Sequence, residues 1–163
     1  MAEITNWLTK HSLQDPNDHI LVKQISRQLE SNDPVSLQSN CLKRSLGICK
    51  EVSLHFNEQI VWINLAGCTS GADALLCIAE SLGTYQGDES LLIDYCQKKT
   101  VLLIVLNPPE PCYGVLSRLN GICQNIQWLF VSNEQIPWTI HCHTIVNNKI
   151  KSIDQSTIYV RAL

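Results

Sequence analysis

The sequence predicts a three-layer α/β domain with a mostly parallel sheet, and three observations lead to this fold class. Strand-like and helix-like apolar patterns alternate from Pro34 onward, as in chains that cover a parallel sheet with helices on both faces. Residues 100–106 (TVLLIVL) are apolar at almost every position, which indicates a central strand buried on both sides. With 163 residues, 45% of them hydrophobic, the chain is long enough for one domain with a complete core.

Residues 1–33 are expected to form an N-terminal helical extension. Apolar residues at positions 4–8, among them Trp7, suggest a short first helix, and residues 20–29 carry a second helical stripe. Asp15-Pro16 supplies a capping residue and a first-turn proline for this second helix, which should stop at Asn32-Asp33-Pro34. The α/β domain is therefore expected to span residues 34–163.

Periodicity predicts the elements of this domain in order. Four strands are expected, at residues 35–38, 60–65, 100–106 and 126–131. Four helices are expected, at residues 42–56, 72–82, 89–98 and 113–122. Gly83 marks a helix end, because glycine readily adopts the left-handed conformation found there. The last thirty residues alternate instead, which predicts an extended C-terminal tail with hairpin-like segments and a turn at Asn147-Asn148.

Charge and cysteine usage exclude several classes of function. Lys and Arg number 12 against 15 Asp and Glu, a net charge of -3, so a broad contact with nucleic acid or an anionic membrane is not expected. No apolar run is long enough to span a bilayer, and the N-terminus has no signal-peptide pattern. The eight cysteines form no C-x-x-C pair and mostly fall in apolar segments. We expect reduced core thiols and a cytoplasmic protein.

Three segments together resemble the P-loop ATPase core of STAND regulators, the signal-transduction NTPases with numerous domains. They are IVWINLAGCTSGADALLCIAESLG (residues 60–83), KTVLLIVLNPPE (residues 99–110) and IQWLFVSNEQIP (residues 126–137). The similarity covers residues 34–137, and the preceding helix fits as well. The resemblance implies a P-loop NTPase-like fold with a nucleotide site at the carboxyl ends of the strands.

The phosphate-binding signature of that family is absent. A P-loop needs Gly-x-x-x-x-Gly-Lys-Ser/Thr, because glycines let backbone N–H groups wrap a phosphate. With residues 35–37 on the first strand, Ser39 and Arg44 stand at the two glycines. Ser45 then stands at the phosphate lysine and Leu46 at the magnesium hydroxyl, although the length from strand to helix matches.

Two further signatures implied by the resemblance are also missing. Asn107 ends the third core strand where an acid would hold magnesium, and an amide lacks the charge that a hard cation requires. Glu110 could replace that acid only if the Pro108-Pro109 turn points it inward. Asn133 follows the fourth strand where an arginine would contact the γ-phosphate.

These losses predict a pseudo-ATPase, a regulatory or protein-interaction module that is not an enzyme. No cofactor and no metal are expected, and the expected partner is a protein of unknown identity, with Trp7 as the contact candidate and a homo-oligomer left open. A first alternative is a divergent nucleotide-binding protein or ATPase that uses Lys43, Arg44 and Glu110, with Ser45 and Asn107 beside the nucleotide. A second is a DNA-associated transcription regulator using residues 1–33. An unrelated α/β domain with polar strand ends stays open as well.

Two other clusters have both a chemical and a structural interpretation. His141-Cys142-His143 places two histidines on one strand face, a spacing that can bind zinc, but no partner pair is visible and a structural role is favoured. Cys68-Thr69-Ser70-Gly71 opens a helix and could form an anion-binding or nucleophilic turn. The favoured interpretation is that Thr69 or Ser70 caps the helix and Cys68 packs beneath it.

Overall fold

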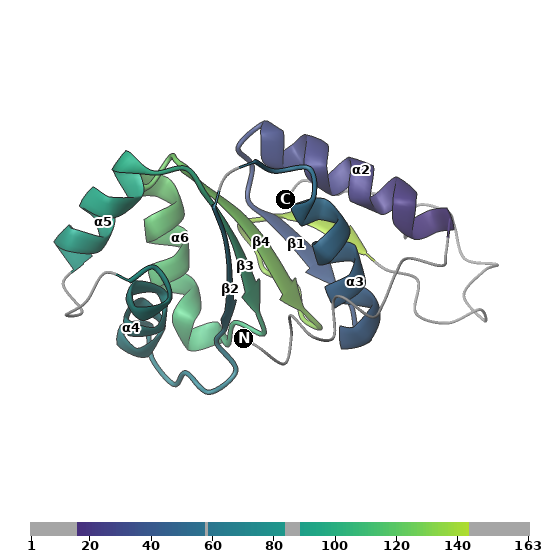
Figure 1. Ribbon diagram of the computed structural model, residues 1–163. Coiled ribbons are helices and arrows are strands. Elements are labelled where there is room, and N and C mark those ends of the chain that lie inside the picture. Colours follow the sequence, from purple (N-terminus) through teal and green to yellow (C-terminus); the bar gives the residue numbers. More distant parts are fainter. Residues whose placement is uncertain (1–15, 58, 84–88, 144–163) are drawn as a thin grey trace.

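A single parallel sheet organises the chain in the computed structural model, which describes residues 16–57, 59–83 and 89–143 (Figure 1). Its strands are β1 (Val35–Gln38), β2 (Gln59–Asn64), β3 (Val101–Leu106), β4 (Ile126–Ser132) and β5 (Ile140–His143). Their order is β2-β3-β4-β1-β5, and every neighbouring pair is parallel. The four strands expected from the sequence are confirmed to within a residue at each end, and β5 adds a fifth.

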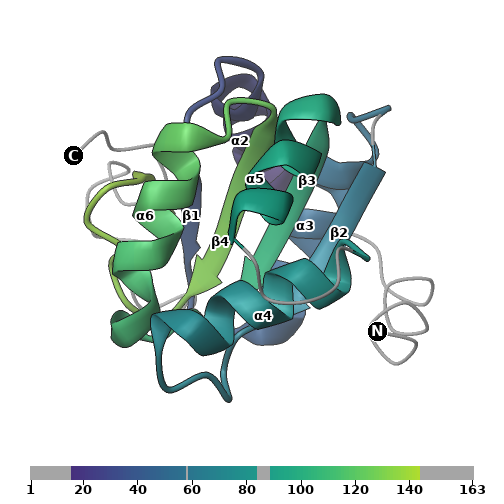
Figure 2. The ribbon, with the colours of Figure 1, turned by 90° about the vertical axis from the view of Figure 1, so that its left-hand side faces the viewer.

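Helices cover both faces of this sheet. α2 (Pro16–Glu30) and α3 (Leu42–Ser53) lie on one face, and α4 (Gly71–Ser81), α5 (Glu89–Lys98) and α6 (Tyr113–Ile122) lie on the other (Figures 1 and 2). A 3-10 turn, η1 (Glu110–Cys112), precedes α6. The prediction of a three-layer α/β domain is confirmed. No helix in the described ranges is long and apolar enough to cross a bilayer.

The all-apolar sequence of β3 is explained by burial on both of its faces. Val101, Leu103 and Val105 belong to the core beneath α4, α5 and α6. Leu102 and Ile104 belong to the core beneath α2 and α3. Successive side chains of a strand point to opposite faces, so a strand between two helical layers must be apolar at every position. All six residues of β3 are buried.

The connections that follow β1 and its neighbour β4 leave in opposite directions across the sheet. From β1 the chain passes through α3 to β2 at one edge, and then returns through β3 to β4, which lies beside β1. Crossovers between parallel strands are right-handed, so the two directions of travel place their helices on opposite faces. In such sheets, ligands bind where the strand order reverses, at the carboxyl ends of the strands.

Three expectations need correction or extension. Residues 140–143, expected as an extended segment of the tail, form β5, which pairs with β1 in parallel; the turn expected at Asn147-Asn148 lies outside the described residues. The helix expected at residues 42–56 ends at Ser53. α2, assigned to an extension, contributes Leu21, Ile25 and Leu29 to the same core as β1. Trp7, the expected first helix and the tail from residue 144 onward lie outside the described residues.

Candidate functional site

The loops that follow β1, β3 and β4 meet at the carboxyl edge of the sheet. The backbone N–H of Ser39 donates to the carbonyl of Ser132 at 2.9 Å, which joins the ends of β1 and β4. The N–H of Asn107 donates to the carbonyl of Val131 at 2.8 Å, which joins β3 to β4. Gln38 adds a bond from its Nε2 to the carbonyl of Asn133 at 3.2 Å. The topological switch point therefore brings together the strand ends that the sequence singled out.

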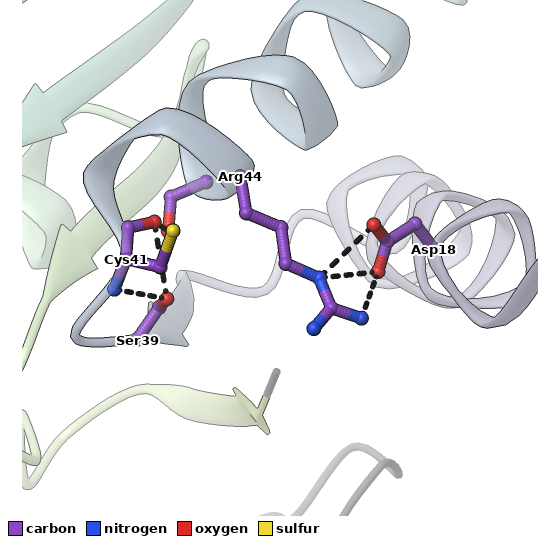
Figure 3. A network of polar contacts seen from close by, with 5 residues as sticks. Asp18, Ser39, Cys41 and Arg44 are labelled. Atoms are coloured by element: carbon purple, nitrogen blue, oxygen red, sulfur yellow. Dashed lines mark hydrogen bonds and ion pairs between the residues drawn. The ribbon is translucent and has the colours of Figure 1, made fainter. Parts of the chain in front are cut away.

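The turn after β1 is short, and its own side chains close it. Only Ser39, Asn40 and Cys41 separate β1 from α3, so the expectation of a segment of P-loop length is wrong. The Cys41 N–H donates to Ser39 Oγ at 3.0 Å, and the Ser39 hydroxyl donates to the Cys41 carbonyl at 3.3 Å (Figure 3). Ser45 is buried, and its hydroxyl donates to the same carbonyl at 2.9 Å. These contacts fix the turn through its polar side chains, without a glycine.

Arg44 is bound by an acid on a different helix. Its Nη2 lies 2.7 Å from Asp18 Oδ1, and its Nε lies 3.0 Å from both carboxylate oxygens. The two side chains are 20% and 6% exposed, so the pair is largely shielded from water. In Figure 3 the Arg44 side chain extends away from the Ser39–Cys41 turn toward α2. The guanidinium therefore connects the first turns of α2 and α3.

The other predicted nucleotide-site residues lie in the segments that follow β1 and β3. Lys43 is exposed in the first turn of α3. Asn107 is exposed and has φ 52°, a left-handed conformation that asparagine tolerates better than most residues. Glu110 is exposed and opens η1. Ser45, by contrast, is hydrogen-bonded directly to the turn after β1.

Negative charge collects beside the ends of β3 and β4. Burial raises the pKa of Tyr113, and the charges of Glu134 and Glu110 raise it further. The backbone N–H of Glu134 donates to Ser132 Oγ at 3.0 Å, which fixes the start of its loop. An anionic phosphate group would be repelled by this pair of acids.

Two members of this edge, Asp18 and Glu134, were not predicted from the sequence as site residues. Glu134 had a usable signal, since it stands three residues past a predicted strand end. Asp18 had only a weak signal in the sequence: it is an acid in the first turn of a helix, where the helix dipole favours negative charge.

The turn before α4 is a helix cap, as the favoured interpretation predicted. Ser70 is the N-cap, and its Oγ accepts the Asp73 N–H at 3.2 Å. Asp73 Oδ2 in turn accepts the Thr69 N–H at 3.0 Å and the Thr69 hydroxyl at 2.9 Å. Cys68 is buried beneath this cap. Its sulfur lies 3.7 Å from that of Cys77.

The histidines and cysteines are the remaining residues that could bind a metal or form disulfides. The described ranges contain no group of three or more His, Cys, Asp or Glu residues that could hold a metal ion. The backbone of His141 and His143 lies in β5, in register with Ser36 and Gln38. Seven of the eight cysteines fall where their side chains are described, and all seven are free thiols, five of them buried.

Two solved structures are similar to this fold. The ORC2 protein of Aeropyrum pernix, solved in ADPNP-ADP complexes, matches 76% of this chain over 42% of its own length, with a TM-score of 0.51 and 13% identity. A chain of Drosophila ORC bound to AT-rich DNA and Cdc6 matches 96% of this chain over 53% of its own length, with a TM-score of 0.51 and 16% identity. No protein-family model and no curated protein matches the sequence.

Both neighbours are AAA+ proteins of the ORC/Cdc6 type, which contain a P-loop NTPase core. The likeness shows that this chain has a P-loop NTPase-like α/β fold. The chain spans about half the length of the two chains that it matches.

Proposed function

We propose that this chain is a regulatory, protein-binding module on a P-loop NTPase-like scaffold of STAND type that no longer binds or hydrolyses nucleotide. The observation that carries the proposal is the turn after β1. Three residues, closed by their own hydroxyl and amide groups, replace the glycine-rich loop that would wrap a phosphate. A loop of this kind leaves no ring of backbone N–H groups around an anion.

The charges around the turn support the same conclusion. Arg44, the nearest predicted phosphate contact, is bound to Asp18 through a two-oxygen contact, and withdrawing it would leave a 6%-exposed carboxylate without its partner. Glu110 and Glu134 add negative charge at the neighbouring strand ends. Asn107 offers an amide oxygen where magnesium binding needs a carboxylate. Loss of catalysis and loss of phosphate binding thus have one structural basis in this proposal.

A folded scaffold without a nucleotide site can still act by binding another protein. The core is fully formed, with two buried clusters of apolar residues on the two faces of the sheet. One of the two neighbours is part of an assembly, Drosophila ORC with DNA and Cdc6. We propose a protein partner in the cytoplasm. DNA binding is the less favoured alternative, because the chain has a net charge of -3.

Divergent nucleotide binding is the second candidate, favoured by the neighbour that was solved with ADPNP and ADP. A thermal-shift titration separates the two functions. Reduced protein is titrated with ATP, ADP and GTP, with and without magnesium. A nucleotide at about a hundred times its dissociation constant would stabilise the fold by roughly 2.7 kcal/mol.

We expect an unchanged melting temperature with every nucleotide. A magnesium-dependent rise that is lost in Lys43→Ala would overturn the proposal and identify a nucleotide-binding protein. Lys23→Ala, which removes an exposed lysine of α2, is the control for a general loss of positive charge. A rise with duplex DNA alone would favour the DNA-associated alternative.

A further inference from the structure

Three thiols gather beneath the N-terminus of α4. Cys68 comes from the turn after β2, Cys77 from the second turn of α4, and Cys112 from η1. The sulfurs of Cys68 and Cys77 are 3.7 Å apart. The Cys112 thiol donates to the carbonyl of Ser70 at 3.4 Å, so it is bonded to the cap itself. The close pair is therefore Cys68 and Cys77, with Cys112 as its neighbour.

The approach of the two sulfurs is fixed by the backbone around them. The Cys68 N–H donates to the Leu65 carbonyl at 3.0 Å, which closes the turn after β2. Ser70 and Asp73 bond reciprocally, and Thr69 donates twice to Asp73, so the residues on both sides of Cys68 are held against α4. Cys77 lies on the helix that this cap begins. The distance between the thiols is thus a property of a rigid turn.

We propose that Cys68 and Cys77 form a thiol-oxidation site, at which hydrogen peroxide converts the two thiols into an intramolecular disulfide. This inference does not depend on the proposed function. A disulfide has an S–S length of about 2.05 Å, and rotation of two short side chains can close the remaining gap. Cys77 is half-buried and is the thiol that peroxide reaches, whereas Cys68 is 8% exposed.

Oxidation of the pair takes two steps. The sulfur of Cys77 attacks peroxide, the O–O bond breaks, and an S–O bond forms; the departing hydroxide takes the thiol proton and leaves as water. Cys68 then attacks the sulfur of the Cys77 sulfenic acid, the S–O bond breaks, and a second water leaves. Two thiols lose two electrons in total, and one peroxide gains them and becomes two waters.

The local environment sets the order of the two thiols. Burial, together with the hydrogen bond to Cys77, raises the pKa of Cys68 to about 12, so Cys68 stays protonated while Cys77 reacts.

The other described cysteine pair is a poorer candidate. Cys96 on α5 and Cys123 after α6 are hydrogen-bonded to each other, and both are only 1% exposed. Neither thiol of that pair has the access to peroxide that Cys77 has. Oxidation should therefore begin at the carboxyl edge of the sheet.

Peptide mapping tests the site directly. Reduced, folded full-length chain is treated with excess hydrogen peroxide, and remaining thiols are blocked with iodoacetamide. Trypsin and a protease that cuts before aspartate separate Cys68 (residues 51–72) from Cys77 (residues 73–87). We expect these two peptides to be joined by a disulfide that a reductant cleaves, at about tenfold higher yield than any other cysteine pair, because the fold holds the sulfurs together.

Matched variants make the result specific. Cys77→Ser should abolish the crosslink, whereas Cys41→Ser, which removes another half-buried thiol, should leave it unchanged. The preference for this pair should disappear when the oxidation is repeated in concentrated urea, because unfolding separates the sulfurs. A dominant Cys68–Cys112 crosslink, an equal yield of random pairs in the folded chain, or fully reduced Cys68 and Cys77 after treatment would each overturn the proposal.

Discussion

Asp18 and Arg44 form the ion pair that connects α2 to α3, and its geometry sets its energetic role. Arg44 stands in the first turn of α3, where the helix dipole disfavours a cation. Asp18 stands in the first turn of α2, where the dipole favours an acid. The pair therefore compensates for an unfavourable cation position and stabilises the packing of the two helices.

Asp18→Asn is expected to lower the free energy of unfolding by about 2 kcal/mol, because it leaves the guanidinium 20% exposed and without its counter-ion. Urea denaturation followed by circular dichroism measures the loss. The control is Asp94→Asn, which breaks the exposed Lys98–Asp94 pair and should cost less than about 0.5 kcal/mol. Equal losses in the two variants would contradict a structural role for Asp18.

Asp73 links the α4 cap to pH. Hydrogen bonds from the Thr69 N–H and hydroxyl lower the pKa of Asp73 below its ordinary value of 3.8. A carboxyl group with a depressed pKa stabilises the fold above its ordinary pKa, and this stabilisation is lost as the pH falls through the lowered value. Asp73→Asn should therefore melt at a lower temperature than the native chain at pH 7, and the difference should shrink below about pH 4. A difference that is constant from pH 7 to about pH 2 would argue against this cap.

At the scale of elements, two glycines in helices have opposite roles. A Cβ on Gly71, the first residue of α4, would lie 2.9 Å from Cγ2 of Val115 on α6. Gly121 in α6 has no atom within 4 Å of such a Cβ. Gly71 thus permits the close packing of α4 on α6, and Gly121 only adds flexibility.

Gly71→Ala should destabilise the chain by about 1 kcal/mol, because the β-branched Val115 has little freedom to move away. Gly121→Ala should stabilise it by about 0.5 kcal/mol, because alanine favours the helix and meets no neighbour. Thermal unfolding of the two variants and the native chain under the same conditions measures both changes in stability, one negative and one positive. Stabilisation by both substitutions would show that α4 and α6 are not in close contact at Gly71.

Local elements could be predicted from the sequence because their signals are local. α5 begins and ends where its helical stripe does, and β3 is recognisable from its unbroken apolar run. A cap by Thr69 or Ser70 followed from their position before an apolar helix, and the structure assigns it to Ser70. Each of these features depends on fewer than about twenty neighbouring residues, which a periodic pattern can encode.

At the scale of the whole molecule, long-range pairing could not be predicted in this way. The strand order is set by contacts between residues far apart, such as Val35 beside Leu129 and Ile140. Four apolar-polar residues at 140–143 fit a hairpin as well as a parallel edge strand. Asp18 and Arg44 are 26 residues apart, with no shared period to connect them. The sequence therefore identified the strand ends that meet at this edge, while the partners of their side chains emerged only from the fold.

The central position of β1 has a consequence for the synthesis of this protein. β1 is made first, and both of its neighbours in the sheet, β4 and β5, come about a hundred residues later in the chain. At roughly 5–20 residues per second, a ribosome needs about 5–20 s to make that stretch. During this interval Val35 and Leu37 have no strand to pair with and must stay covered by α2 and α3, the helices on either side of them in the sequence. We therefore expect the packing of α2 on α3, to which the Asp18–Arg44 ion pair contributes, to cover β1 in the nascent chain before it holds the finished one.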